Sequence, residues 1–178
     1  LKADGASVNS WGVGTKLITS ADSPSLGGVY KLAASFKEGE FEPKIKLSED
    51  PEKISNPGYK KVFRIYNEEN KAEADLIMLH NESIDESKPL TIFHPTYTWK
   101  TKSFENYTVK ELLKPLFING ECKYKHKNVM EIREYVNNEL NSLWEEYRRL
   151  SNPQTYKVDL SRDLWYLKTK MIDSKKFI

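Results

Sequence analysis

The sequence predicts a mixed fold of strands and helices, in which β-hairpins dominate and one long helix stands out. Short apolar runs separated by Gly, Pro and Asn recur through the first two thirds of the chain, as is typical of hairpins. Further along, apolar residues recur every three or four positions, as on one face of a helix. The 178 residues are 38% hydrophobic and 30% charged, which excludes a collagen-like or largely disordered chain.

The first elements are expected around a glycine-containing segment. A short strand at 7–11 precedes residues 12–15, which lead into a stretch that can start a helix. Breaker residues mark 21–28 as a loop. Strands at 29–36 and 41–47 are then expected to form a hairpin with a longer loop.

The middle of the chain is expected to be mostly sheet. Asn56-Pro57-Gly58 fits a type II turn, because Pro suits its second position and Gly its third. Strands are expected at 62–66 and 74–79, joined by the polar turn 67–71. Residues 89–102 give another extended run.

Residues 108–120 mark the change from sheet to helix. The piece 108–114 is expected to be helical and to stop before Pro115, which cannot continue a helix. Asn119-Gly120 is a turn signal.

The clearest element is a helix that starts after Asn128 and runs to Leu150. Asn128 is a suitable N-cap, and Glu131 completes a capping box. A strand at 156–160 follows, and Ser161 is expected to cap a last helix.

The net charge and the cysteine content bear on which partners the protein binds and in which cell compartment it is expected. There are 28 basic and 26 acidic residues, so a net charge of +2 gives no general reason to expect nucleic acid or an anionic membrane as a partner. No apolar run approaches the roughly 18 residues of a membrane span. The single cysteine, Cys122, excludes an internal disulfide, and a cytoplasmic location is expected.

The first residues suggest that the sequence was cut from a longer protein. Residues 1–6 read like the last turn of a helix capped by Gly5, and no methionine or secretory signal precedes them. Removal of a tag from a short natural protein is the alternative.

Gly12-Val13-Gly14-Thr15 is the main candidate for a binding site. Glycines let a backbone bend and approach a ligand closely, and exposed amides followed by a helix start can cradle a phosphate. The Thr15 hydroxyl adds a donor. Taken alone, the segment fits a simple tight turn better than a phosphate site, because it lacks the full glycine fingerprints of nucleotide-binding loops.

Three blocks of sequence occur together in a recognisable order. They are residues 11–19, residues 24–32, and residues 46–53 followed by Asn56-Pro57-Gly58 and Arg64. In order and spacing they resemble the nicotinate phosphoribosyltransferases. The resemblance covers roughly residues 1–170 and is strongest in the first 80.

This resemblance implies an activity and an architecture. The family forms nicotinate mononucleotide and diphosphate from nicotinate and 5-phosphoribosyl 1-diphosphate, coupled to ATP hydrolysis, in NAD biosynthesis. Its enzymes have an irregular α/β barrel. Residues 1–48 would hold the last barrel strands and the phosphate loop, and residues 49–178 an appended domain of hairpins with one long helix. The class is then α/β, or α+β for the isolated fragment.

The resemblance also implies residue roles. Residues 12–15 would hold phosphate of the ribosyl donor, with Thr15 the best single ligand. Asn9 stands where many relatives carry an acidic residue, so a role in touching ribose or metal is uncertain for it. Lys53 could reach phosphate or could simply shape a turn. Preorganised donors would stabilise charge on the departing diphosphate.

Other implied parts of the enzyme are missing. The family's phosphorylated histidine, an arginine and a tyrosine that hold nicotinate all lie upstream. The chain alone is therefore expected to be inactive and to bind neither Mg²⁺ nor ATP tightly, although the full enzyme, an expected homodimer, would use both. The alternative is a non-enzymatic module that binds phosphate ligands or pairs with a separate subunit.

The remaining candidates give weaker signals. His80, His94 and His126 lie too far apart for a metal motif, and none is expected to be catalytic. Lys123–Lys127 alternates cations with aromatic residues, which fits single-stranded nucleic acid but fits a solvated strand edge better. Cys122 is either incidental or a thiol activated by nearby lysines.

Overall fold

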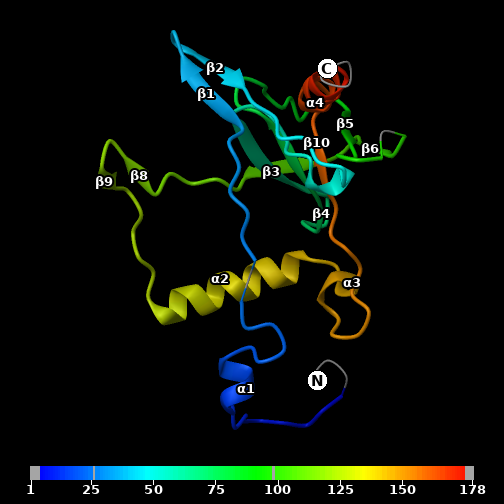
Figure 1. The fold of residues 1–178 in the computed structure, drawn as a ribbon. Helices are drawn as coiled ribbons and strands as arrows, with labels where there is room; N and C mark the ends of the chain where they lie inside the picture. Colours follow the sequence, from blue (N-terminus) through cyan, green and yellow to red (C-terminus); the bar gives the residue numbers. More distant parts are fainter. Residues whose placement is uncertain (1–4, 26, 98, 175–178) are drawn as a thin grey trace. The chain divides into compact units, whose positions relative to one another are not determined.

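The computed structural model describes residues 5–25, 27–97 and 99–174 (Figure 1). The chain divides into two compact units, residues 1–31 and 32–178. Within these described residues, no helix is long and apolar enough to cross a membrane.

The first unit contains one short helix, α1, Thr15–Ile18. It begins directly after the glycine-containing segment, as the sequence suggests. The strand predicted at 7–11 was wrong, because these residues form no ladder. A strand exists only where a neighbour accepts and donates its backbone hydrogen bonds, and no described segment pairs with this one.

The second unit is built on a six-stranded sheet in the order β6-β5-β10-β4-β3-β7. Neighbours are antiparallel except β10 and β4, which run parallel. The strand bounds are β3 Lys60–Tyr66, β4 Ala72–Leu79, β5 Leu90–Phe93, β6 Thr101–Phe104, β7 Thr108–Glu111 and β10 Val158–Leu160. The predicted strands at 62–66, 74–79 and 156–160 are confirmed. A mixed fold with most strands in sheets is therefore confirmed, while the barrel and the domain boundary at residue 48 stay predictions.

The core lies on one face of this sheet. Alternate residues of β4 are buried, and Leu76 and Met78 pack there with Ile65 of β3. Ile92 of β5 and Phe104 of β6 complete the same cluster. The two-residue alternation in the sequence thus becomes one buried and one more accessible face.

Strands β1, Ala34–Lys37, and β2, Glu40–Pro43, form a separate hairpin. Both strands are shorter than predicted, and the connection is a two-residue turn, not a longer loop. Glu38 and Gly39 have φ of 53° and 88°. Two successive residues with positive φ make the tight turn whose twist suits a hairpin.

The helix predicted at 108–114 was wrong. Residues 108–111 form β7 and pair with β3, which has no other neighbour on that side. Tertiary pairing with an open strand edge outweighs a weak local helix preference. The turn at Asn119-Gly120 is confirmed, with φ of 50° and 82°, between β8 Phe117–Ile118 and β9 Glu121–Cys122.

Helix α2, Val129–Ser142, begins as predicted. The Asn128 side chain accepts from the amides of Met130 and Glu131, and the Glu131 carboxylate accepts from the Asn128 amide. The helix ends at Ser142 and does not reach Leu150. Leu143 and Trp144 are extended before the short helix α3, Glu145–Arg148.

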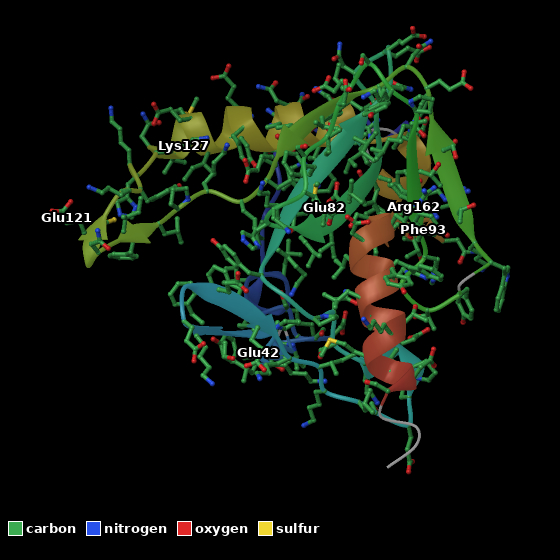
Figure 2. All side chains as sticks on the ribbon, turned by 90° about the horizontal axis from the view of Figure 1, so that it is seen from above. Glu42, Glu82, Phe93, Glu121, Lys127 and Arg162 are labelled. Carbon is green, nitrogen blue, oxygen red and sulfur yellow. The ribbon has the colours of Figure 1, made fainter. Side chains whose placement is uncertain are left out.

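Helix α4, Arg162–Asp173, follows β10 and packs against β4 and β5. The predicted cap is confirmed, because the Ser161 hydroxyl accepts from the Leu164 amide at 3.2 Å. Near its start the Phe93 ring stacks on Trp165, with centroids 5.4 Å apart, and Arg162 lies 5.9 Å from the centroid of the same ring (Figure 2).

A short 3-10 helix, η1 Pro51–Lys53, precedes the predicted type II turn. Gly58 has φ of 88°, the value that the third position of this turn requires. The conformation of Gly58 is therefore the one predicted, while the turn type itself stays a prediction.

Candidate functional site

A group of paired charges lies on the sheet. Arg64 of β3 and Asp75 of β4 are cross-strand partners in the hairpin. The guanidinium donates Nε to Oδ1 at 2.8 Å and Nη2 to Oδ2 at 3.0 Å. The two side chains are only 18% and 13% exposed, so this bidentate pair is shielded from solvent.

Three further residues extend the pair into a network. Glu139 of α2 accepts from Arg64 Nη1 at 3.0 Å and from Lys110 Nζ of β7 at 2.9 Å. The Tyr156 hydroxyl donates to Asp75 Oδ1 at 3.1 Å, and Arg64 lies 5.6 Å from the Tyr156 ring centroid. The network therefore joins α2 to strands of the sheet.

The pKa values of Arg64 and Tyr156 in this network are both raised. The hydrogen bond to Asp75 is the main cause that raises the pKa of Arg64, and burial is the main cause that raises the pKa of Tyr156. Neither group exchanges a proton near neutral pH. The arrangement is therefore suited to positioning elements and not to acid–base catalysis.

An open hollow of about 480 Å³ lies beside the network. It is bordered by the β3–β4 turn, by β7 and by the end of α2. Its two lysines are engaged, because Lys71 Nζ donates to the Asn141 carbonyl at 2.8 Å and Lys110 pairs with Glu139. The hollow shows no set of converging groups that would define a ligand.

The predicted phosphate segment lies in the first unit. Gly14 is the residue before α1, and the side chain of Thr15 is exposed. Within the described residues, no acceptor takes a hydrogen bond from the amides of residues 12–15. A Cβ at Gly12 or Gly14 would meet nothing within 4 Å, and neither glycine has a positive φ. Backbone conformation therefore does not demand glycine at either position, and the phosphate-binding role of this segment stays a prediction.

Asn9 and Lys53 do not share one unit. Asn9 lies at an exposed bend in the first unit, with residues 12–15. Lys53 lies in η1 of the second unit, where its Nζ is 3.1 Å from Asp50 Oδ2.

The histidines have separate structural surroundings. His94 Nδ1 accepts from the amides of Thr96 and Tyr97 at 3.1 and 3.0 Å, and burial is the main cause that lowers its pKa. His80 packs on Tyr59, while His126 lies on a different part of the chain. No group of three or more His, Cys, Asp or Glu in the described part of the chain could hold a metal ion.

Glu82 is a carboxylate that sequence reasoning missed. Its Oε2 accepts from the Leu79 amide at 2.6 Å and from the Ser161 hydroxyl at 2.8 Å, which ties the end of β4 to the start of α4. Burial raises the pKa of Glu82. No local sequence signal indicates this contact, since Ser161 is far away in the chain.

The raised pKa of Glu82 predicts a pH-dependent effect of Glu82→Gln. A carboxyl group whose folded pKa exceeds its unfolded value favours folding below the unfolded pKa, and this contribution is lost as pH rises through the folded pKa. At pH 7 the charged form is therefore the unfavourable one in the fold. We expect Glu82→Gln to have a higher Tm than the wild type at pH 7 and no such advantage at pH 4, measured by thermal unfolding. Glu86→Gln, at an exposed position, is the control, and equal gains in both variants would contradict the prediction.

Comparison with known proteins identifies the family. Residues 59–168 match the model of the nicotinate phosphoribosyltransferase C-terminal domain. A nicotinate phosphoribosyltransferase of Bacillus subtilis (strain 168) is 45% identical over 99% of this chain and 36% of its own length. The Homo sapiens nicotinate phosphoribosyltransferase is 32% identical over 92% of this chain and 30% of its own length. The chain thus spans about a third of the length of these relatives.

A solved structure supports the fold. The crystal structure of human nicotinic acid phosphoribosyltransferase superposes with a TM-score of 0.61, covering 66% of this chain and 24% of that chain at 24% identity. This similarity concerns the fold alone. The family assignment comes from the sequence matches, and by them the chain belongs to the nicotinate phosphoribosyltransferase C-terminal domain family.

Proposed function

We propose that this chain is the C-terminal part of a nicotinate phosphoribosyltransferase that acts in NAD biosynthesis. The complete enzyme would form nicotinate mononucleotide and diphosphate from nicotinate and 5-phosphoribosyl 1-diphosphate, with coupled ATP hydrolysis. The observation that carries the proposal is the 45% identity over 177 residues, because this alignment includes the predicted phosphate segment as well as the sheet.

Residues 12–15 would serve as the phosphate cradle. Their amides are not used by other described residues, and the exposed Thr15 hydroxyl can donate beside them. When diphosphate leaves the anomeric carbon, negative charge grows on its oxygens. Donors already pointing at those oxygens would lower the barrier more than they stabilise the substrate. Lys53 could add a positive charge, and Asn9 a neutral contact where an acid would otherwise stand.

Other parts of the proposed enzyme would be supplied from outside this chain. Mg²⁺ would balance the charge of the leaving diphosphate. ATP, nicotinate and the phosphorylated histidine would be held by upstream residues. We further propose a cytoplasmic homodimer as the complete enzyme, with no nucleic acid or membrane partner.

Thr15→Val in the complete enzyme tests the phosphate cradle. Valine keeps the shape but removes the hydroxyl, and a hydrogen bond to a charged phosphate contributes about 1.5 to 3 kcal/mol. We expect the Kd of the ribosyl donor, measured by calorimetry, to rise roughly ten- to 150-fold. Thr19→Val is the control, because the Thr19 hydroxyl already donates to the Thr15 carbonyl at 2.8 Å. Unchanged donor affinity in Thr15→Val would refute the assignment.

The purified 178-residue chain is expected to form no nicotinate mononucleotide from nicotinate, donor, ATP and Mg²⁺. The physical reason is that it lacks the groups expected to bind nicotinate and to accept phosphate from ATP. Chromatography of the reaction mixture measures whether nicotinate mononucleotide is formed. A sustained rate would show that the described residues are sufficient and would refute this part of the proposal.

A further inference from the structure

Helix α2 carries a row of apolar residues that no described part of the chain covers. The row, called here the α2 stripe, has spacings of three and four and consists of Val129, Ile132, Val136 and Leu140. Residues at these spacings share one face of a helix. All four are between 44% and 79% exposed, and α2 contains no buried residue.

Helix α4 shows how an apolar helix face is used elsewhere in this chain. It has 12 residues, packs against β4 and β5, and buries Leu164 completely. A helix as short as the 14 residues of α2 is only marginally stable alone in water, and packing of its apolar face normally supplies most of its stability. Apolar patches that stay exposed commonly mark interaction sites. The α2 stripe therefore has the character of a contact surface without its partner.

The end of α2 is nevertheless fixed to the sheet. Glu139 accepts hydrogen bonds from Arg64 and Lys110, and the Asn141 carbonyl accepts one from Lys71 Nζ at 2.8 Å. These contacts use polar positions of the helix and none of the stripe residues. The stripe is thus presented on a helix that is already held in place, which lowers the entropic cost of docking.

The size of the relatives indicates what covers the stripe. This chain spans about a third of their length, so about two thirds of a complete enzyme lies outside it. A segment of the same polypeptide is present at a high effective concentration and therefore competes well with any separate molecule for a bare face. The first unit lacks cover as well, because α1 has no buried residue and Leu17 and Ile18 are both more than 70% exposed. Each unit thus lacks an apolar surface to pack on.

We propose that the α2 stripe is the docking surface for the upstream part of the same polypeptide. This rests on the function proposed above, in which the chain is the C-terminal part of a longer enzyme. The stripe is then buried in the complete enzyme and bare in the 178-residue chain. The upstream surface that meets it is apolar and belongs to the same molecule, not to a second copy or to an unrelated protein.

Ile132→Asp tests the docking surface, and Asn138→Asp, on a different face of α2, is the matched control. In the complete enzyme we expect Ile132→Asp to lower the Tm by at least about 4 °C, because it buries a carboxylate without a partner, and Asn138→Asp to change it by less than about 2 °C. Both positions are exposed in the 178-residue chain. There we expect each variant to shift the Tm by less than about 2 °C. Thermal unfolding followed by circular dichroism gives all four values.

Three results would overturn the docking proposal. They are an unchanged Tm of the complete enzyme in Ile132→Asp, an equal loss in Asn138→Asp, and an equal loss in the 178-residue chain. An unchanged Tm of the purified enzyme is also the outcome if an unrelated protein covers the stripe.

Sedimentation velocity of the complete enzyme distinguishes a second copy from the upstream part. We expect Ile132→Asp to keep the oligomeric state of the wild type, and dissociation into smaller species would show that a second copy covers the stripe and would refute the proposal. Neither measurement uses catalysis. A complete wild-type enzyme that forms no nicotinate mononucleotide would therefore refute the proposed function, while the Tm comparison would still test the docking surface.

Discussion

Arg64→Leu is expected to lower the free energy of unfolding by about 3 kcal/mol, as is typical when one partner of a shielded ion pair is removed. The Asp75 carboxylate would keep only the Tyr156 hydroxyl among its described partners, and Glu139 would lose its bond from Nη1. Both carboxylates are largely shielded by the fold, so water cannot fully replace the guanidinium. Urea denaturation followed by circular dichroism measures the change.

Lys110→Met is the matched control for this prediction. Lys110 binds the same Glu139 carboxylate at 2.9 Å, but its side chain is 52% exposed. Exposed pairs contribute roughly 0 to 1 kcal/mol, because water and salt screen them. If Lys110→Met destabilises the fold as much as Arg64→Leu, shielding of the Arg64–Asp75 pair is not the cause.

Gly58→Ala is also expected to lower the free energy of unfolding by about 3 kcal/mol. Gly58 has φ of 88°, a conformation that costs an L-residue about 1 to 2 kcal/mol. A new Cβ would lie 2.7 Å from Leu79 Cδ2, so Leu79 would have to move at a further cost, typically about 1 to 3 kcal/mol. Chemical denaturation again gives the measurement.

Gly39→Ala separates these two costs. Gly39 has the same φ of 88°, but a Cβ there would meet nothing within 4 Å. Only the conformational cost remains, and we expect a loss of about 1 kcal/mol. Equal losses in the two variants would show that Leu79 yields freely and that crowding at Gly58 is not important.

Sequence signals predicted correctly those features whose interacting residues lie a few positions apart in the chain. The capping box at Asn128 and the cap at Ser161 form as predicted, because each involves residues three positions apart. The turn at Asn119-Gly120 also forms as predicted, since these two residue types tolerate positive φ.

Local signals failed where a distant partner decides the conformation. Residues 108–114 favour a helix when considered alone, yet β7 forms because the edge of β3 is available. The long helix was predicted to reach Leu150, but the chain leaves the helix at Leu143. There Trp144 Nε1 donates to Glu73 Oε1 at 3.2 Å, on a strand 71 positions earlier.

In the candidate site, too, some features follow from neighbouring residues and others from contacts between distant parts of the chain. The sequence identified residues 12–15 through their motif and through the family resemblance, and the family itself is shown by the matches to relatives. Their role in holding phosphate stays a prediction. The contacts of Lys168 with Asn56 and of Glu82 with Ser161 had no signal in the sequence, because each pair is brought together by the packing of α4.

The sequence by itself determined the family, the β3–β4 hairpin, the helix caps and the turn at Asn119-Gly120, since these follow from residue types a few positions apart. The tertiary structure decided that β10 lies between β4 and β5 and that Arg64 meets Glu139. The physical reason is that strand edges and charged side chains are satisfied by whichever partner the folded chain brings within hydrogen-bond distance, and that partner is not encoded in the neighbouring residues.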